Sequence, residues 1–177
     1  YGRERGVRII PEIDMPGHAS SGWIQVDKKA VTCADSWWDN PGGTHSAVQP
    51  NPGQLDISYE GTYKLIKDVY TEAANLFKDN VFHVGSDELM TYCFNYSSSA
   101  MDWFRQRSGS TYSDFAQYYI DKALPIFMDK PERRLMMWED IVLSHEMRAK
   151  KVPKDIIMQA WNKGVENIKK LAEQGYD

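Results

Sequence analysis

Four short apolar runs divide the chain, and each is followed by a turn or a polar stretch. Runs of this length, bounded in this way, are typical of strands that are buried on both faces. They predict strands over residues 7–13, 81–85, 135–138 and 156–160.

The stretches between and after these runs repeat apolar residues at the three- and four-residue spacing of a helix face. The first predicted helix covers 63–77, with Ser58 as its N-cap. A second follows Ser113 and should bend or end at Pro125, because proline cannot donate the helical hydrogen bond. A third covers about 165–173.

Strands and helices therefore alternate, which predicts an α/β fold with a parallel sheet. Polar side chains follow the predicted strands, at the edge where β/α barrels and doubly wound sheets both bind ligands. We favour the barrel, because no glycine-rich phosphate loop follows any of the strands. The side chains at this edge are Asp14, Asp87, Glu88, Glu139, Asp140 and Asn162.

The number of units limits this assignment. A complete (β/α)8 TIM barrel takes eight strands and about 250 residues, whereas this chain offers four strand and helix units in 177 residues. Four units would leave two long sheet edges unpaired. We therefore expect a partial TIM barrel, in which residues 1–177 are a fragment of a single β/α-barrel catalytic domain that the remainder of a longer chain completes.

Charge and composition narrow the class of partner. The formal net charge is −4 and the pI is near 5.6, so we expect no nucleic-acid partner and no membrane partner. No apolar run approaches the roughly 20 residues that a membrane helix needs. The chain has six Trp and ten Tyr, whose flat faces suit sugar rings but also fill cores.

Cys33 and Cys93 lack the further ligands of a structural metal site, so a disulfide is the better interpretation. Asn95 begins the N-glycosylation sequon Asn95-Tyr96-Ser97. Together these features favour a secreted or secretory-route protein, either extracellular or vacuolar and lysosomal.

The strongest chemical signal is the segment His83-Val84-Gly85-Ser86-Asp87-Glu88. Strand alternation places His83, Gly85 and Asp87 on one face, and a turn can bring Glu88 into the same cleft. Repulsion and partial burial should raise the pKa of one carboxyl group, giving a general acid beside a carboxylate that stays ionised. The alternative for an ordinary Asp-Glu pair is a solvated helix cap.

Four segments occur in the order and approximate spacing of one enzyme family: Pro11-Glu12-Ile13-Asp14-Met15-Pro16-Gly17-His18-Ala19, His83 to Glu88, Met137-Trp138-Glu139-Asp140 and Met158-Gln159-Ala160-Trp161. In these segments the chain resembles the β-N-acetylhexosaminidases, glycoside hydrolase family twenty, and is most similar to the fungal secreted enzymes. The resemblance implies a β/α barrel whose third to sixth strands precede the four segments.

The resemblance also implies the reaction, which is hydrolysis of terminal non-reducing N-acetylhexosamine residues from chitooligosaccharides or glycoconjugates. Glu88 would be the general acid and base, and Asp87 would orient the 2-acetamido group of the substrate. The acetamide oxygen then attacks the anomeric carbon, so the enzyme needs no nucleophile of its own and configuration is retained. His18 would position Glu88 and influence its protonation.

By the same resemblance, Trp138 and Trp161 would enclose the acetamide and the sugar face, and Asp14 would lie at the rim of the site. The bond between Cys33 and Cys93 would tie together the loops after the third and fourth strands. The family's sugar-clamping Arg, its second-strand Asp, and its acetamide-binding Tyr and further Trp fall outside these residues. The fragment alone should therefore be inactive.

The main alternative is a catalytically inactive carbohydrate-binding barrel protein, against which the intact Asp87, Glu88 and His18 argue. A metal-dependent hydrolase would need His and carboxylate ligands at several strand ends. We expect no metal ion and no cofactor. The sequence leaves open the preference between glucosamine and galactosamine substrates, the linkage, and the oligomeric state, a homodimer included.

Overall fold

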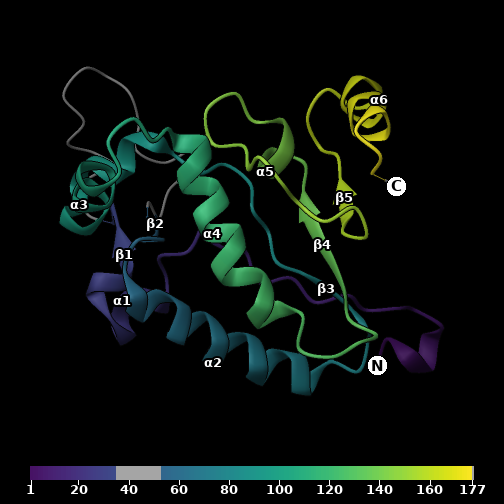
Figure 1. The fold of residues 1–177 in the computed structure, drawn as a ribbon. Helices are drawn as coiled ribbons and strands as arrows, with labels where there is room; N and C mark the ends of the chain where they lie inside the picture. The colour runs from purple at the N-terminus through teal and green to yellow at the C-terminus, as the bar shows by residue number, and fades with distance from the viewer. Residues whose placement is uncertain (35–52, 177) are drawn as a thin grey trace.

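The computed structural model describes residues 1–34 and 53–176. Figure 1 shows the order of the elements in space. The helices are α1 (Trp23–Val26), α2 (Glu60–Leu76), α3 (Ser98–Gln106), α4 (Tyr112–Phe127), α5 (Asp140–Leu143) and α6 (Val165–Glu173), with the 3-10 turns η1 (Arg3–Arg5), η2 (Lys28–Ala30) and η3 (Thr91–Tyr96). The strands are β1 (Val31–Thr32), β2 (Gln54–Leu55), β3 (Val81–His83), β4 (Arg134–Trp138) and β5 (Ile157–Gln159).

The strands β3, β4 and β5 form a parallel sheet in that order, and the arrows of β4 and β5 in Figure 1 point the same way. Phe82 lies opposite Leu135, and Trp138 lies opposite Gln159. Because the strands are parallel, their carboxyl ends meet at one edge of the sheet. The three later predicted strands and the α/β class are thus confirmed.

The predicted strand over 7–13 is wrong, since it is reduced to a single parallel bridge between Glu12 and His83. The chain still runs beside β3, because the N–H of Ile13 donates to the carbonyl of His83 at 3.1 Å and the N–H of His83 donates to that of Pro11 at 3.0 Å. Within the described ranges this segment has a partner on one side only, and proline has no N–H to extend a ladder.

The first predicted helix is confirmed as α2, but its N-cap is Tyr59 and no side chain caps it. The hydroxyl of Ser58 donates instead to Asp56. The third predicted helix is confirmed as α6, in which Leu171 is buried while Val165 and Ile168 are exposed.

The second predicted helix is confirmed as α4, which begins one residue before Ser113. Its N-cap is Thr111, whose side chain and that of Asp114 form a reciprocal capping box. The capping box satisfies two N–H groups of the first turn and so fixes where the helix starts. Pro125 lies inside the helix, which ends two residues later at Phe127.

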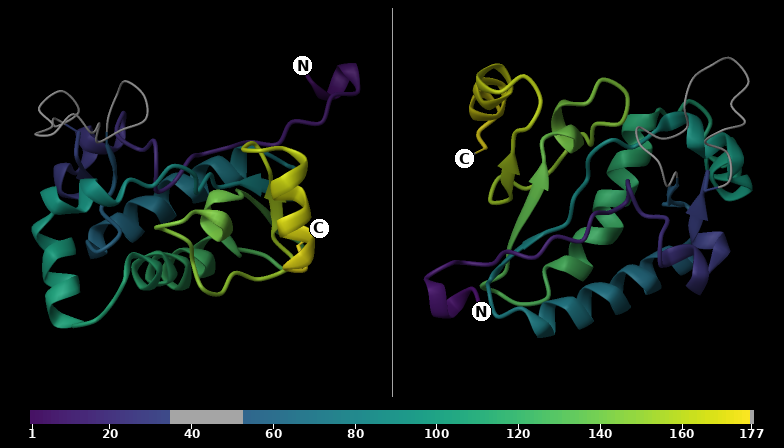
Figure 2. Two further views of the ribbon diagram at one scale, coloured as in Figure 1. Left: turned by 90° about the horizontal axis from the view of Figure 1, so that it is seen from above. Right: turned by 180° about the vertical axis from the view of Figure 1, so that it is seen from behind.

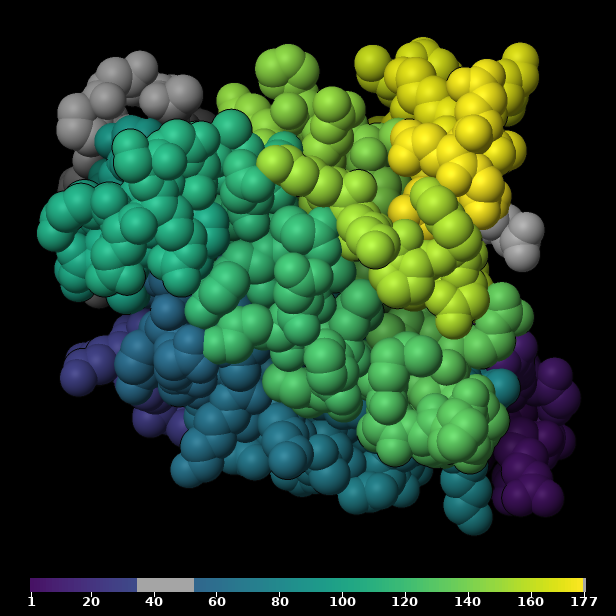
Figure 3. All heavy atoms as spheres, in the orientation of Figure 1, coloured from purple at the N-terminus to yellow at the C-terminus, as the bar shows by residue number. Residues whose placement is uncertain are grey.

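Helices α2 and α4 cover the sheet at β3, and Figure 2 shows them side by side in both views. The ring of Tyr70 lies 4.9 Å from that of Phe82 and 5.2 Å from that of Phe127, and all three side chains are fully buried. In Figure 3 the atoms of α4 fill the space between α2 and the β4–β5 region. This packing anchors β3 in the core. The Asp-Glu pair, residues 87 and 88, follows the carboxyl end of the same strand.

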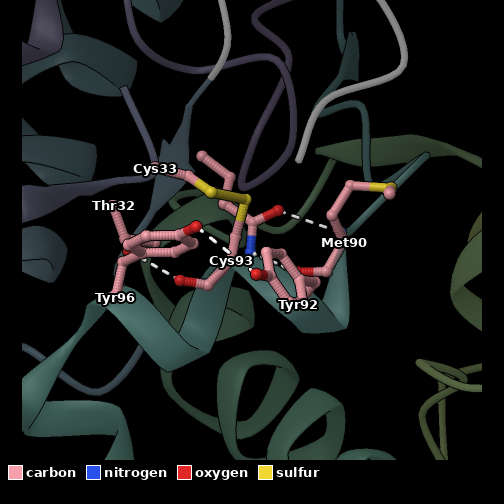
Figure 4. Close-up of a disulfide and its surroundings, with 7 residues drawn as sticks. Thr32, Cys33, Met90, Tyr92, Cys93 and Tyr96 are labelled. Atoms are coloured by element: carbon pink, nitrogen blue, oxygen red, sulfur yellow. Dashed lines mark hydrogen bonds between the residues drawn. A yellow bond between two sulfur atoms is a disulfide. The ribbon is translucent and has the colours of Figure 1, made fainter. Parts of the chain in front are cut away.

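The predicted disulfide between Cys33 and Cys93 is present and joins the residue after β1 to η3 (Figure 4). Next to it, the hydroxyl of Thr32 donates to the carbonyl of Cys93 at 2.8 Å. The side-chain amide of Gln54 pairs with the backbone of Met90, at 2.9 and 3.1 Å. The antiparallel pair β1–β2 is therefore fastened to the segment that follows the Asp-Glu pair.

In the described ranges, no helix combines the length and the apolar character needed to cross a membrane.

Candidate active site

The backbone changes conformation directly after β3. The N–H of Val84 donates to Met136 and the N–H of Trp138 donates to Gly85, at 3.0 and 2.9 Å, so contact with β4 continues. Gly85 and Ser86, however, have φ values of 70° and 83°. A left-handed backbone ends the two-residue alternation of a strand. The predicted alternation past residue 83 is therefore wrong, and this turn is what directs the carboxylates.

A hollow of about 500 Å³ lies at the carboxyl end of the sheet. Both carboxylates of the Asp-Glu pair face it, together with two indoles and a histidine. Its lining residues are Glu12, Asp14, His18, Asp87, Glu88, Trp138 and Trp161. The structure thus brings together the six residues that the sequence analysis singled out for catalysis and substrate binding, and it adds Glu12 to them.

Two glycines make the close packing behind Asp87 feasible. A Cβ on Gly85 would lie 1.7 Å from Oδ1 of Asp14, and a Cβ on Gly17 would lie 2.4 Å from the carbonyl oxygen of Asp87. No side chain fits at such distances. Oδ1 of Asp14 is buried although Asp14 also lines the hollow, and the predicted place of this residue at the rim of the site remains a prediction.

The surroundings of Asp14 favour its protonated form. Burial raises the pKa of Asp14 to about 8, and the negative charge of Asp87 and a hydrogen bond with it act in the same direction. A protonated carboxyl group can donate a hydrogen bond to an ionised one. A protonated Asp14 therefore supplies a donor to Asp87.

His18 lies between the two catalytic candidates. Its Nε2 is 3.0 Å from Oε2 of Glu88 and 3.4 Å from Oδ2 of Asp87. The hydrogen bond with Asp87 raises the pKa of His18 to about 9, and the charges of Asp87, Asp14 and Glu88 add to this, whereas burial opposes it. The imidazole is therefore a cation at neutral pH, held among three carboxyl groups.

The pKa values of the two adjacent carboxyl groups move apart. Burial raises the pKa of Glu88, with the charges of Asp87 and Asp140 adding to it and His18 opposing. Burial also acts to raise the pKa of Asp87, but hydrogen bonds from His18 and Asp14 outweigh it and leave the pKa below its ordinary value. One group is thus suited to donate a proton, and its neighbour to remain charged.

Each of the two indoles is hydrogen-bonded to a carboxylate. Nε1 of Trp138 donates to Oε1 of Glu12 at 3.0 Å, and Nε1 of Trp161 donates to Oδ2 of Asp140 at 2.7 Å. Trp161 is 46% exposed. Trp138 ends β4 and Trp161 follows β5, whereas Asp87 and Glu88 follow β3, so apolar faces and acidic groups line the same hollow.

His83 supports Trp138 from behind, with ring centroids 4.9 Å apart. Its Nδ1 accepts the N–H of Gly85 at 3.0 Å, so this nitrogen carries no proton. Burial lowers the pKa of His83, which keeps the ring neutral. Its 3.5 Å approach to Glu12 is therefore no ion pair.

Glu139 binds several groups of the chain after β5, whereas the sequence predicted only that it lies at the end of a strand. It is buried and accepts hydrogen bonds from the N–H groups of Trp161 and Asn162, at 2.7 and 2.8 Å, and from the side chain of Asn167 at 3.1 Å. The sequence did carry a signal, because Glu139 follows buried Met137 by two residues, which is the spacing of one strand face.

Within the described part of the chain, one group of side chains has the geometry to hold a metal ion. The oxygen and nitrogen atoms of Asp14, His18 and Asp87 all lie within 4.8 Å of one another. Metal ligands must be deprotonated, whereas the pKa values of Asp14 and His18 are raised to about 8 and 9. The group is suited to sharing protons, and the absence of a metal remains a prediction.

Known proteins resemble the whole chain. Residues 1–177 match the family described as glycosyl hydrolase family 20, catalytic domain. A beta-hexosaminidase of Emericella nidulans is 54% identical over 179 residues, covering 100% of this chain and 30% of the relative. Beta-hexosaminidase 1 of Coccidioides posadasii is 52% identical over the same shares. The chain thus spans about 30% of the length of these relatives.

Solved structures share the fold. A family 20 exo-beta-N-acetylglucosaminidase from Vibrio harveyi, solved in complex with N-acetylglucosamine, has a TM-score of 0.72 at 24% identity, covering 99% of this chain and 26% of that one. A chitobiase from Flavobacterium johnsoniae has a TM-score of 0.71 at 25% identity, with the same coverage. The described elements therefore have the arrangement of part of these catalytic domains.

Proposed function

The chain belongs to glycosyl hydrolase family 20 and is of the fungal type, and from this premise we propose that it carries the catalytic groups of a β-N-acetylhexosaminidase. The enzyme removes terminal non-reducing N-acetylhexosamine residues from chitooligosaccharides or glycoconjugates. The relatives named beta-hexosaminidases support this assignment.

One observation carries the proposal. Asp87 and Glu88 face the same hollow between two indoles, and their pKa values shift in opposite directions. Ordinary retaining glycosidases need two carboxyl groups about 5 to 5.5 Å apart, on opposite sides of the bond. Adjacent residues suffice when the nucleophile is the acetamide group of the substrate, as in the substrate-assisted families.

The reaction proceeds in two steps. Glu88 gives its proton to the glycosidic oxygen, which leaves as an alcohol while the acetamide oxygen bonds to the anomeric carbon. Asp87 accepts the N–H of the acetamide and stabilises the positive charge that develops on the oxazolinium-like intermediate. Water then gives a proton to Glu88 and bonds to the anomeric carbon as the bond from that carbon to the acetamide oxygen breaks, which restores the 2-acetamido group and retains the configuration.

The remaining site residues prepare these steps. His18 positions Glu88 and balances its charge after proton transfer, and Asp14 holds Asp87 by a hydrogen bond. Trp138 and Trp161 enclose the acetamide and the sugar face, which limits water and keeps the attacking oxygen in place.

The position of the chain within the whole protein forms part of the proposal. Residues 1–177 are a fragment of a single catalytic domain and span about the third to sixth strands of a (β/α)8 barrel. The parallel order β3-β4-β5 and the extended segment beside β3 support this placement. The disulfide and the exposed sequon residue Asn95 support a secretory route, extracellular or vacuolar and lysosomal.

The test uses the full-length protein and a chromogenic N-acetyl-β-glucosaminide. Replacing Glu88→Gln should lower kcat by about 10²–10⁴-fold, because the proton donor is lost. Glu173→Gln, an exposed carboxylate on α6, is the matched control and should keep wild-type kcat. Wild-type turnover in Glu88→Gln would refute the assignment, and sugar binding without turnover by the unaltered protein would favour an inactive binding protein.

A further inference from the structure

Two consecutive carboxylates hold Trp161 at opposite ends. Glu139 accepts the backbone N–H of Trp161 at 2.7 Å, and Asp140 accepts its indole N–H at 2.7 Å. Trp161 as a whole is 46% exposed, so neighbouring groups cover only part of it. The indole hydrogen bond is therefore a contact that restrains the orientation of the ring.

Asp140 also lies beside Glu88. Its charge is among the causes that raise the pKa of Glu88, and the backbone of Glu88 in turn acts to lower the pKa of Asp140. Burial is the main cause that raises the pKa of Asp140, and the indole of Trp161 opposes it. Among the described residues, the charges of His18, Asp87 and Asp140 act on the pKa of Glu88, and Asp140 is the one that α5 contributes.

We propose that Asp140 is a positioning residue, which fixes the indole of Trp161 by a hydrogen bond and places its negative charge beside Glu88. One side chain thereby sets both the sugar wall and the proton donor. Asp140 is not among the residues that line the hollow, so it acts through these two neighbours and not on the sugar. The inference rests on the proposed function.

A simpler role has to be separated from this one. Asp140 is the first residue of the short helix α5, and a negative charge at the N-terminus of a helix stabilises it. In that role its replacement would lower stability without altering the pH profile, and its effect would not depend on Trp161.

Three replacements in the full-length enzyme distinguish the two roles. Asp140→Asn removes the charge but keeps an oxygen that accepts a hydrogen bond, whereas Asp140→Ala removes both. Trp161→Phe keeps an aromatic wall but removes the N–H donor. Asp155→Asn, an exposed residue in the turn before β5, is the matched control.

The rate constants kcat and KM are measured on the chromogenic N-acetyl-β-glucosaminide across pH, with melting temperatures for every variant. On the acidic plateau, Asp140→Ala should have a kcat/KM roughly tenfold below that of Asp140→Asn, the effect of one lost hydrogen bond to a charged group. In the Trp161→Phe background this difference should disappear, because the donor is already gone. Both Asp140 variants should lose activity at lower pH than the wild type, since removing the charge lowers the pKa of Glu88.

The inference is overturned if the Ala and Asn variants differ equally in both backgrounds, or if the alkaline limb of kcat/KM matches that of the wild type and of Asp155→Asn. If Asp140→Ala folds poorly, the inference can still be tested, because Trp161→Phe removes the same hydrogen bond by changing an exposed side chain. If Glu88→Gln abolishes turnover while Asp140 variants behave as the control, the proposed function stands and this inference alone fails. An inactive wild-type enzyme refutes both.

Discussion

Nε2 of His18 lies 3.0 Å from Oε2 of Glu88. The hydrogen bond with neighbouring Asp87 raises the pKa of His18 to about 9, so this contact joins a cation to a carboxyl group at neutral pH. Glu88, the proposed proton donor, therefore contacts a group that itself gains and loses a proton with pH, unlike a carboxyl group that is buried among apolar side chains. Stability and activity should then respond to the same histidine.

The first prediction concerns stability against pH. The pKa of His18 in the folded protein, about 9 against an ordinary 6.5, means that its contribution is complete below pH 6.5 and is lost as the pH rises through about 9. His18→Asn should therefore flatten the fall in melting temperature of the full-length protein between these limits. His145→Asn, in an exposed bend, should leave the wild-type slope. Equal slopes for all three proteins would contradict the ion pair.

A second prediction concerns Gly85. Gly85→Ala forces a methyl group to within 1.7 Å of Oδ1 of Asp14 and keeps a φ of 70°. The backbone penalty alone is about 1–2 kcal/mol, and displacing Asp14 should bring the total loss of unfolding free energy to roughly 3–5 kcal/mol. Because Asp14 holds Asp87, kcat should fall as well.

The control for this variant is Gly109→Ala, at a turn with a φ of 86° and no atom within 4 Å of the added Cβ. It should lose only the backbone penalty, about 1–2 kcal/mol, with kcat unchanged. Chemical denaturation measures both losses. Equal losses at the two glycines would mean that the contact with Asp14 costs nothing.

Local composition was enough to predict three of the four proposed strands, because each is an apolar run buried between helices. The segment over 7–13 has the same composition, yet it forms only a bridge at Glu12. A strand is a property of a pair, and Val7 and Ile9 are about half exposed. Sequence patterns report the apolar residues but not whether a partner covers them.

The residues of the site could be predicted from the sequence, but the contacts between them could not. Asp87 was expected in the cleft through alternation and Glu88 through a turn, whereas left-handed residues directly after β3 bring both of them there. The pairing of Asp140 with Trp161 depends on the register of β4 and β5, in which Trp138 lies opposite Gln159. Asp140 and Trp161, which are also 21 residues apart, lie side by side for the same reason. The pattern of residues within one strand does not reveal how that strand aligns with its neighbour.

A third prediction concerns the disulfide. Replacing both Cys33 and Cys93 by Ala should lower the unfolding free energy by about 4 kcal/mol, because the bond closes a long loop in the unfolded chain. The sequence separation is 60 residues. Denaturation of the full-length protein measures the loss, and peptide mass analysis of the wild type should find the two cysteines linked. Unchanged stability would show that the pairing of Gln54 with Met90 holds this region by itself.

The last prediction separates two roles of Ser97, as part of the glycosylation sequon and as the cap of α3. Ser97 is buried and caps α3 by accepting the N–H of Ala100 at 3.0 Å, and its hydroxyl also donates to Asp56. Asn95, in contrast, is exposed on η3. Asn95→Gln and Ser97→Ala both abolish the sequon, so mass measurement should find both equally without glycan. Only Ser97→Ala loses the cap and leaves Asp56 short of a donor, which should cost about 1–3 kcal/mol beyond the Asn95 variant. Equal melting temperatures for the two glycan-free proteins would show that the hydroxyl serves the sequon alone.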